Sequence, residues 1–189
     1  MTKSNPSGFT RRGILAAFAA TTVAAAPTYS HAFSFLRRAG DIRRLKMYNP
    51  RTGESMDTVY WIEGEYITEA LREITYFMRD WRNDATKAID TRTVDIMAAA
   101  HRLLEIDEPY SLLSGYRSPQ TNRMLRARGG AVASNSLHLK GEAADLRLNS
   151  RTVNQMARAA TALGAGGVGR YSRSNFVHMD CGQTRSWGS

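Results

Sequence analysis

Two histidines and one aspartate of this 189-residue chain lie in short segments that are otherwise rich in apolar residues. Residues 136–145 read SLHLKGEAAD, so Gly141 separates His138 from a strand-like run that contains Asp145. His178 lies further along in a second strand-like run, FVHMD. A buried carboxylate is costly unless it has a polar partner. The chain must therefore fold so that Asp145 meets one, and the histidines are candidates.

Hydrophobic periodicity predicts a mixture of helices and short strands. Apolar residues recur at helical spacing over 67–81 and 94–104, and a turn at 49–53 separates two alternating strands, 45–48 and 58–62. Further strands are expected at 110–116, 142–148, 166–171 and 176–181, with a helix after Ser118 and another over 152–163. This order predicts an α+β domain in which helices flank a small antiparallel sheet.

Residues 1–32 have the composition of a cleavable export signal. A positive segment with Arg11 and Arg12 precedes an apolar stretch, and small residues precede a cleavage site after Ala32. The paired arginines indicate the twin-arginine route. A membrane anchor is the alternative, but the apolar run is shorter than the ~20 residues that a span needs, and Pro27 interrupts it. We expect a basic connector at 33–41, one domain at 42–189, and no stable membrane span after signal removal.

The chain is basic, with a formal net charge of +9. Removal of residues 1–32 takes away three cations and no acids, which leaves +6. In an exported protein this charge favours an anionic polymer of the cell envelope, although a solvated surface of mixed charge explains it equally well. A nucleic-acid partner is not expected, because the sequence lacks an aromatic platform and a basic stripe.

Two further side chains with possible chemistry are assigned to packing. Cys181 is the single cysteine, so no disulfide can form within the chain. Its apolar, strand-like setting favours a small buried residue over a nucleophile. His101 falls on the apolar face of its predicted helix, where a core or boundary histidine is the better interpretation than a ligand.

Two imidazoles and one carboxylate can hold a catalytic zinc ion. Such a three-ligand set leaves a fourth position open for water, and zinc lowers the pKa of that water to ~7. From spacing alone, this interpretation of His138, Asp145 and His178 is level with two unrelated histidines in surface or capping roles, since two-histidine patterns are common.

Several motifs in the same order resemble the D-Ala-D-Ala metallopeptidase family, related to lysostaphin and the hedgehog fold, and within it the murein endopeptidase K group: SGYRS at 114–118, SLHLKGEAAD at 136–145, GGVG at 166–169 and SNFVH at 174–178. The likeness covers nearly all of the chain after the signal and includes NPRTGE at 49–54. It implies a hedgehog/D,D-peptidase-like fold, with zinc bound by His138, Asp145 and His178. It also implies that Arg117 lies beside the substrate carbonyl and stabilises the developing oxyanion, although an arginine after a strand often only pairs with a surface carboxylate.

The general base is where the sequence departs from the family pattern. Many relatives carry Glu three residues before the last zinc histidine, and others carry His two before it. Here those positions are Asn175 and Phe176. Asp180 projects to the same strand face as His178, so it is either the base or a partner that orients the imidazole. Glu142 is a weaker candidate for the base.

These expectations together describe a zinc-dependent peptidoglycan endopeptidase of the periplasm or cell envelope. Zn2+ is the expected cofactor, peptidoglycan stem peptides are the expected substrate, and a monomer is the expected state. The nearest alternative is a D,D-carboxypeptidase or dipeptidase that acts on D-Ala-D-Ala ends. Another is a noncatalytic, zinc-containing wall-binding module, which the missing glutamate favours and which Arg117 and Asp180 count against.

Overall fold

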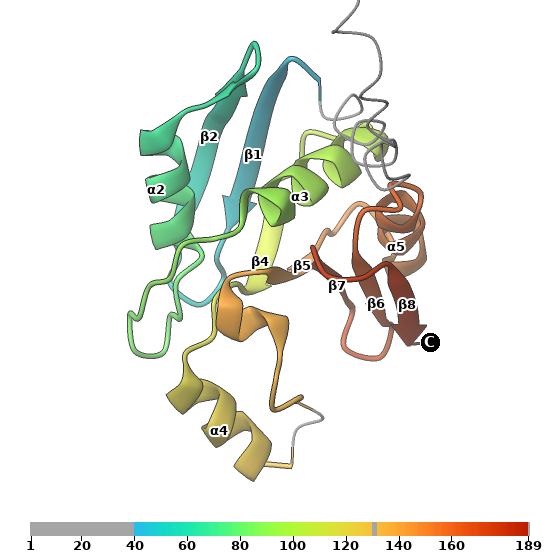
Figure 1. The fold of residues 1–189 in the computed structure, drawn as a ribbon. Helices are drawn as coiled ribbons and strands as arrows, with labels where there is room; N and C mark the ends of the chain where they lie inside the picture. Colours follow the sequence, from blue (N-terminus) through green and yellow to red (C-terminus); the bar gives the residue numbers. More distant parts are fainter. Residues whose placement is uncertain (1–39, 130–131, 189) are drawn as a thin grey trace, which may run out of the picture.

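The computed structural model describes residues 40–129 and 132–188, so the predicted signal and most of the connector lie outside it. An eight-stranded sheet with the order β3-β2-β1-β4-β5-β7-β6-β8 forms its centre (Figure 1). Its strands are β1 (Ile42–Tyr48), β2 (Ser55–Ile62), β3 (Glu65–Tyr66), β4 (Tyr110–Ser114), β5 (Ala143–Arg147), β6 (Gly167–Tyr171), β7 (Phe176–Asp180) and β8 (Arg185–Gly188).

The predicted α+β class is confirmed, but the sheet is larger than expected and mixed. β1 and β2 form the predicted antiparallel hairpin. However, β1 runs parallel to β4, and β6 runs parallel to β8. The first parallel pair arises because α2 and α3 lie between β1 and β4 in the chain and allow the strand direction to be repeated.

The four described α-helices lie where the sequence predicts them: α2 (Thr68–Phe77), α3 (Thr91–Leu103), α4 (Pro119–Ala127) and α5 (Val153–Thr161). Side-chain caps fix the starts of the last three. Asp90 accepts from the first turn of α3, Ser118 does the same for α4, where proline follows it, and Thr152 forms a capping box with Gln155 in α5.

One layer of helices covers the sheet. α2 packs on β2, α3 on β1 and β7, and α5 on β6 and β7, whereas α4 projects beyond the lower end of the sheet (Figure 1). The core between the layers is made by residues such as Met97, Tyr110, Leu146 and Met179. Within residues 40–129 and 132–188, no helix is long and apolar enough to cross a membrane.

Candidate metal centre

Asp145 and His178 face each other across two neighbouring strands. β5 and β7 run antiparallel in a register that pairs Asp145 with His178 and Ala144 with Met179. Side chains alternate between the two faces of a strand. Because Ala144 and Met179 are fully buried in the core, Asp145 and His178 lie on the opposite face of the sheet.

A single-turn 3-10 helix, η1 (Leu137–Lys140), brings His138 to the same place. Gly141 ends this helix in the left-handed conformation, with φ 76°. A Cβ at Gly141 would lie 2.4 Å from the carbonyl oxygen of Ala88, and the backbone N–H of Asp90 donates to the Gly141 carbonyl over 2.9 Å. Glycine is therefore required here, and it separates His138 from β5 as the sequence indicated.

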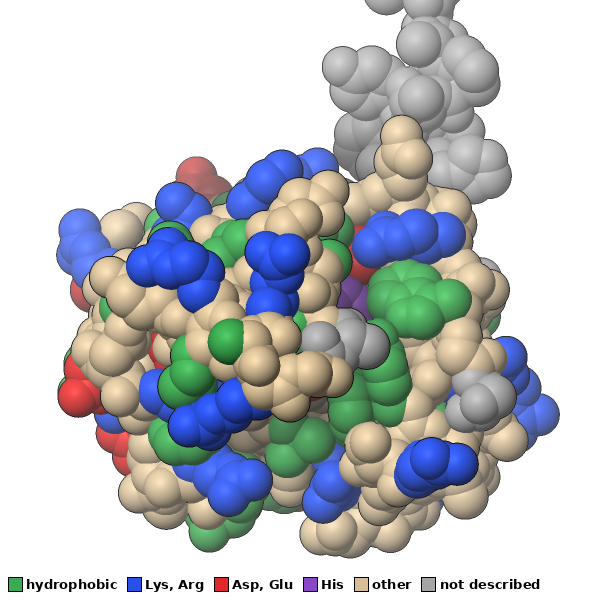
Figure 2. All heavy atoms as spheres, turned by 90° about the horizontal axis from the view of Figure 1, so that it is seen from below, with side chains coloured by type: hydrophobic (Ala, Val, Ile, Leu, Met, Phe, Trp, Pro, Cys, Tyr) green, Lys and Arg blue, Asp and Glu red, His purple; other side chains and the backbone are tan. Residues whose placement is uncertain are grey.

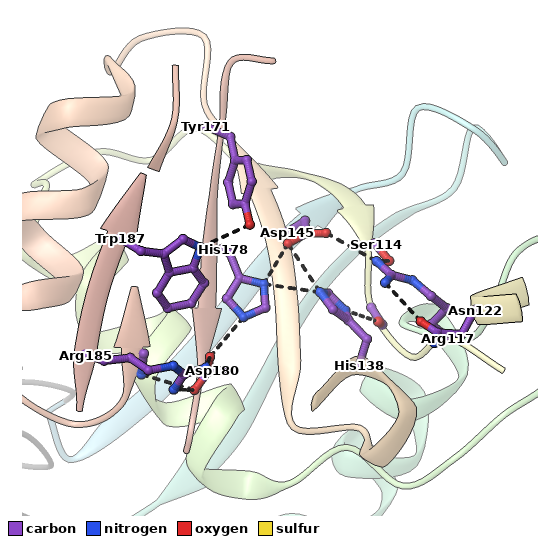
Figure 3. Close-up of polar contacts among 12 residues, drawn as sticks. Ser114, Arg117, Asn122, His138, Asp145, Tyr171, His178, Asp180, Arg185 and Trp187 are labelled. Carbon is purple, nitrogen blue, oxygen red and sulfur yellow. Dashed lines mark hydrogen bonds and ion pairs between the residues drawn. The ribbon is translucent and has the colours of Figure 1, made fainter. Parts of the chain in front are cut away.

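Three donor atoms from these elements face one another (Figure 3). His138 Nε2 lies 3.2 Å from His178 Nδ1, and these nitrogens lie 3.3 Å and 2.9 Å from Asp145 Oδ1. Among the described residues, this is the group of histidine and acidic side chains whose ligand atoms could hold one metal ion. The three residues that the sequence singled out as ligands are thus brought together.

The outer nitrogen of each imidazole donates to a fixed acceptor. His138 Nδ1 lies 2.7 Å from the carbonyl oxygen of Gly115, and His178 Nε2 lies 3.0 Å from Asp180 Oδ2. With protons on these outer nitrogens, the inner nitrogens present lone pairs to each other. In this state both inner nitrogens are free to bind a metal ion, and two imidazoles with one carboxylate fit Zn2+.

The ionisation of the cluster depends on contacts among its own side chains. Burial lowers the pKa of His178, but hydrogen bonds to Asp145 and Asp180 outweigh it and raise that pKa to about 9. Burial raises the pKa of Asp145, yet His138 and His178 outweigh it, so the net pKa lies well below its ordinary value. The carboxylate is therefore ionised, and either a proton or a metal ion must balance it.

Asp180 lies on the side of the His178 ring that faces away from the cluster (Figure 3). Its fully buried carboxylate accepts from the backbone N–H groups of Gly167 and Gly182 and from both terminal nitrogens of Arg185. Burial raises its pKa, and His178 and Arg185 outweigh that effect and lower it. This position favours orientation of the imidazole over the role of general base.

Arg117 lies beside the cluster, and its guanidinium makes few good hydrogen bonds with its neighbours. Its side chain is buried, and its terminal nitrogens make long contacts of 3.5 Å with Asn122, 3.4 Å with Ser114 and 3.7 Å with Asp145. Its Nε has no hydrogen-bond partner among the described residues. The backbone N–H of Arg117 donates to the His138 carbonyl, which connects this residue directly to one of the candidate metal ligands.

A cleft of about 620 Å3 opens over these residues. Tyr171, Phe176 and Trp187 form an aromatic wall on the side away from Arg117 (Figure 3), and Leu137 also lines the cleft. Tyr171 and Phe176 stack with ring centres 4.4 Å apart. The space-filling view shows a histidine in a hollow bordered by apolar and basic side chains (Figure 2).

The sequence did not predict Arg185 and Trp187, because both lie on the short strand β8. The Trp187 indole N–H donates to the hydroxyl oxygen of Tyr171, and the Arg185 guanidinium lies over the indole ring. Two glycines of β6 leave space for them: a Cβ at Gly169 would lie 2.6 Å from the Trp187 ring, and one at Gly167 2.4 Å from Arg185. The glycine-rich run was the available signal.

The remaining candidates lie outside the cleft. His101 packs its ring against Tyr110 and bonds the carbonyl oxygen of Glu108 through Nε2, which confirms its assignment to the edge of the core. Cys181 is buried in the core as predicted, and burial raises the pKa of its thiol. Glu142 does not line the cleft.

Comparison with known proteins gives one consistent family. The family model described as peptidoglycan L,D-endopeptidase MepK matches residues 37–187. The chain is 41% identical to the peptidoglycan L,D-endopeptidase MepK of Escherichia coli (strain K12) over 145 residues. This aligned region covers 77% of this chain and 80% of that relative. It is 32% identical over 146 residues to the probable peptidoglycan L,D-endopeptidase MepK of Haemophilus influenzae, and this region covers 77% of this chain and 78% of that relative. The chain therefore belongs to the MepK family of peptidoglycan L,D-endopeptidases.

Proposed function

We propose that this protein is a zinc-dependent endopeptidase that hydrolyses peptide cross-links between peptidoglycan stem peptides. The cluster of His138, Asp145 and His178 carries this proposal, because its inner donor atoms converge while both outer imidazole nitrogens are occupied. The L,D bond named for its relatives is the bond that we expect it to cut.

Each residue of the centre has a separate task in this proposal. His138, Asp145 and His178 would hold the metal, and Asp180 would keep His178 in the tautomer whose Nδ1 is free to bind. Bound Zn2+ supplies a water of lowered pKa and a Lewis acid for the scissile carbonyl. The aromatic wall excludes water from one side of the reacting amide.

Arg117 is the proposed donor to the oxyanion. A buried guanidinium normally forms a full set of hydrogen bonds, because unsatisfied buried donors are costly. Arg117 has an unpartnered Nε and only long contacts at its terminal nitrogens. Its remaining donor capacity is thus available to the charge that develops on the carbonyl oxygen, a type of interaction worth ~10²–10³ in turnover.

One observation favours a second candidate, a noncatalytic zinc-containing module that binds the cell wall. Among the described residues that line the cleft, Asp145 is the only carboxylate. Asp145 is committed to the metal cluster, and Asp180 lies behind His178. Among the described residues, the cleft therefore contains no free carboxylate that could act as the general base.

The remaining parts of the proposal concern the cellular setting. We infer that the chain is exported by the twin-arginine route, that it is cleaved near Ala32, and that it works in the periplasm or cell envelope as a monomer. The composition of residues 1–32 supports the export step. The family's peptidoglycan substrate supports the location.

The deciding experiment is mass spectrometry of purified cross-linked muropeptides incubated with the protein. Dimers joined by an L,D bond should be converted to monomers, matched dimers joined by a D,D bond should not, and a chelator should abolish the reaction. The purified protein should carry about one zinc per chain, and His178→Ala should lose both metal and activity. A protein that binds zinc but leaves both dimers intact would instead be the noncatalytic module.

A further inference from the structure

Acidic and basic residues are divided unevenly along the chain. Residues 40–109 contain ten Lys and Arg against fourteen Asp and Glu, whereas residues 110–188 contain eleven Lys and Arg against three acids. Two of those acids, Asp145 and Asp180, belong to the metal centre, and the third, Glu142, is half-buried. The part of the chain that builds the cleft therefore presents almost no negative charge to solvent.

Ion pairing differs in the same way. In residues 40–109, seven cations pair with carboxylates: Arg43, Arg44, Lys46, Arg72, Arg79, Arg82 and Arg92. In residues 110–188, the described Lys and Arg ion pairs are those of Arg117 and Arg185, both inside the cleft. Paired charges cancel locally, so the positive potential of the second part is left uncompensated.

Four exposed arginines of the second part lie close in the chain to residues that line the cleft, and we call them the arginine rim: Arg123, Arg126, Arg128 and Arg173. The first three lie on or just after α4. In the chain, this helix lies between two residues that line the cleft, Arg117 and Val132. Arg173 lies in the turn between Tyr171 and Phe176 of the aromatic wall. Figure 2 shows basic side chains spread over this face, with most acidic ones at its margin.

We propose that the arginine rim binds free carboxylates of the peptidoglycan peptides that extend on both sides of the bond to be cut. This inference rests on the proposed function and adds to it how the polymer is held. Arg123 comes from α4 and Arg173 from the turn between β6 and β7, so a partner that reaches both must carry carboxylates at separate points along its length. A cross-linked peptide with a free carboxyl group on each branch would have this chemistry. Exposed charges act over a Debye length of ~8–10 Å at ordinary salt, which suits a flexible polymer.

The test measures binding without cleavage. The full-length chain, kept metal-free with a chelator, is sedimented with purified peptidoglycan sacculi at low salt. One variant combines Arg123→Gln, Arg126→Gln and Arg128→Gln, and another carries Arg173→Gln. Glutamine keeps the helix propensity of α4. The control combines Arg72→Gln, Lys87→Gln and Arg102→Gln, which removes the same charge from exposed positions outside the cleft.

We expect the triple rim variant to bind roughly tenfold more weakly than the wild type, with a smaller loss for Arg173→Gln and little change in the control. The difference should vanish near 1 M salt, where the Debye length is ~3 Å. Sacculi whose carboxyl groups have been converted to amides should bind the wild type as weakly as native sacculi bind the rim variant.

Three results would overturn the proposal: equal losses in the rim variant and the control, unchanged binding to amidated sacculi, or tighter binding to phosphatidylglycerol vesicles than to sacculi. The last would assign the rim to a membrane surface. Circular dichroism of each variant separates a folding defect from lost binding. Because the assay needs neither metal nor turnover, failure of the proposed hydrolysis is detected separately, by the muropeptide digestion.

Discussion

Asp180 connects three parts of the molecule through one buried carboxylate. It accepts from the ring of His178, from Arg185 on β8, and from backbone N–H groups on either side. Ligand histidines commonly depend on such a partner, and its loss typically costs ~10–100-fold in metal affinity. A general base would instead contact the bound water, which the position of Asp180 behind the ring does not favour.

The variant Asp180→Asn separates these roles. We expect a folded protein whose zinc affinity falls ~10–100-fold, because an amide cannot replace the carboxylate that fixes the His178 tautomer. Arg185 loses little, since its side chain is 44% exposed and can turn to solvent. Zinc titration and turnover at saturating zinc should be measured on the same sample. Wild-type zinc affinity with turnover ~10²–10⁴-fold lower would assign Asp180 as the base instead.

Arg117 should show a different balance of stability and activity. Its guanidinium is buried but poorly bonded, so Arg117→Met removes few native interactions. We expect the free energy of unfolding to change by less than ~1 kcal/mol, while turnover falls ~10²–10³-fold with zinc retained. Urea unfolding and steady-state kinetics check both quantities. A large stability loss with proportionate loss of zinc would show that Arg117 is structural.

At the scale of elements, the sequence predicted the helices and strands whose signals lie within their own residues. α3, α4 and α5 were recognisable because apolar periodicity coincides with capping residues such as Ser118 and Thr152. Two of the proposed metal ligands, Asp145 and His178, were recognisable because they interrupt apolar strand patterns at 142–148 and 176–181. β8 was not predicted, because four residues carry no periodicity and it forms only by parallel pairing with β6.

The fit between β6 and β8 can be tested at Gly169. An alanine Cβ would lie 2.6 Å from the Trp187 ring, so Gly169→Ala must displace the indole and disturb the strand that carries Arg185. We expect a loss of ~1–3 kcal/mol in the free energy of unfolding, typical of overpacking, and weaker zinc binding. The exposed Ser186→Ala on β8 is the control. Tryptophan fluorescence and denaturant unfolding measure the change, and a Gly169→Ala protein that matches the control would refute this view of β8.

At the scale of the whole chain, the export segment and the folded domain make independent predictions. Replacing Arg11 and Arg12 by lysine should prevent appearance of the processed form in the envelope, because the twin-arginine route reads the arginine pair. The purified domain should keep its metal and activity, since the proposed ligands all lie between residues 138 and 178. Cell fractionation with an antibody to the domain checks the first part. Normal processing of the double lysine variant would exclude the twin-arginine route.

The last prediction concerns how the metal stabilises the molecule. The proposed ligands come from η1, β5 and β7, which an unfolded chain does not hold together, so zinc should bind the folded state selectively. Free zinc at 100 times its dissociation constant then adds ~2.7 kcal/mol of stability. At ~2–4 °C per kcal/mol for a domain of this size, the unfolding temperature should rise by about 5–10 °C.

Differential scanning calorimetry with zinc and with a chelator measures this shift. His178→Ala should unfold at the same temperature under both conditions, whatever its own stability, because the comparison is made within one variant. Cys181→Ser is the matched control: it alters a residue that can bind zinc but lies outside the cluster, so it should retain the full shift. If His178→Ala keeps the shift or Cys181→Ser loses it, the stabilising ion binds elsewhere than between His138, Asp145 and His178.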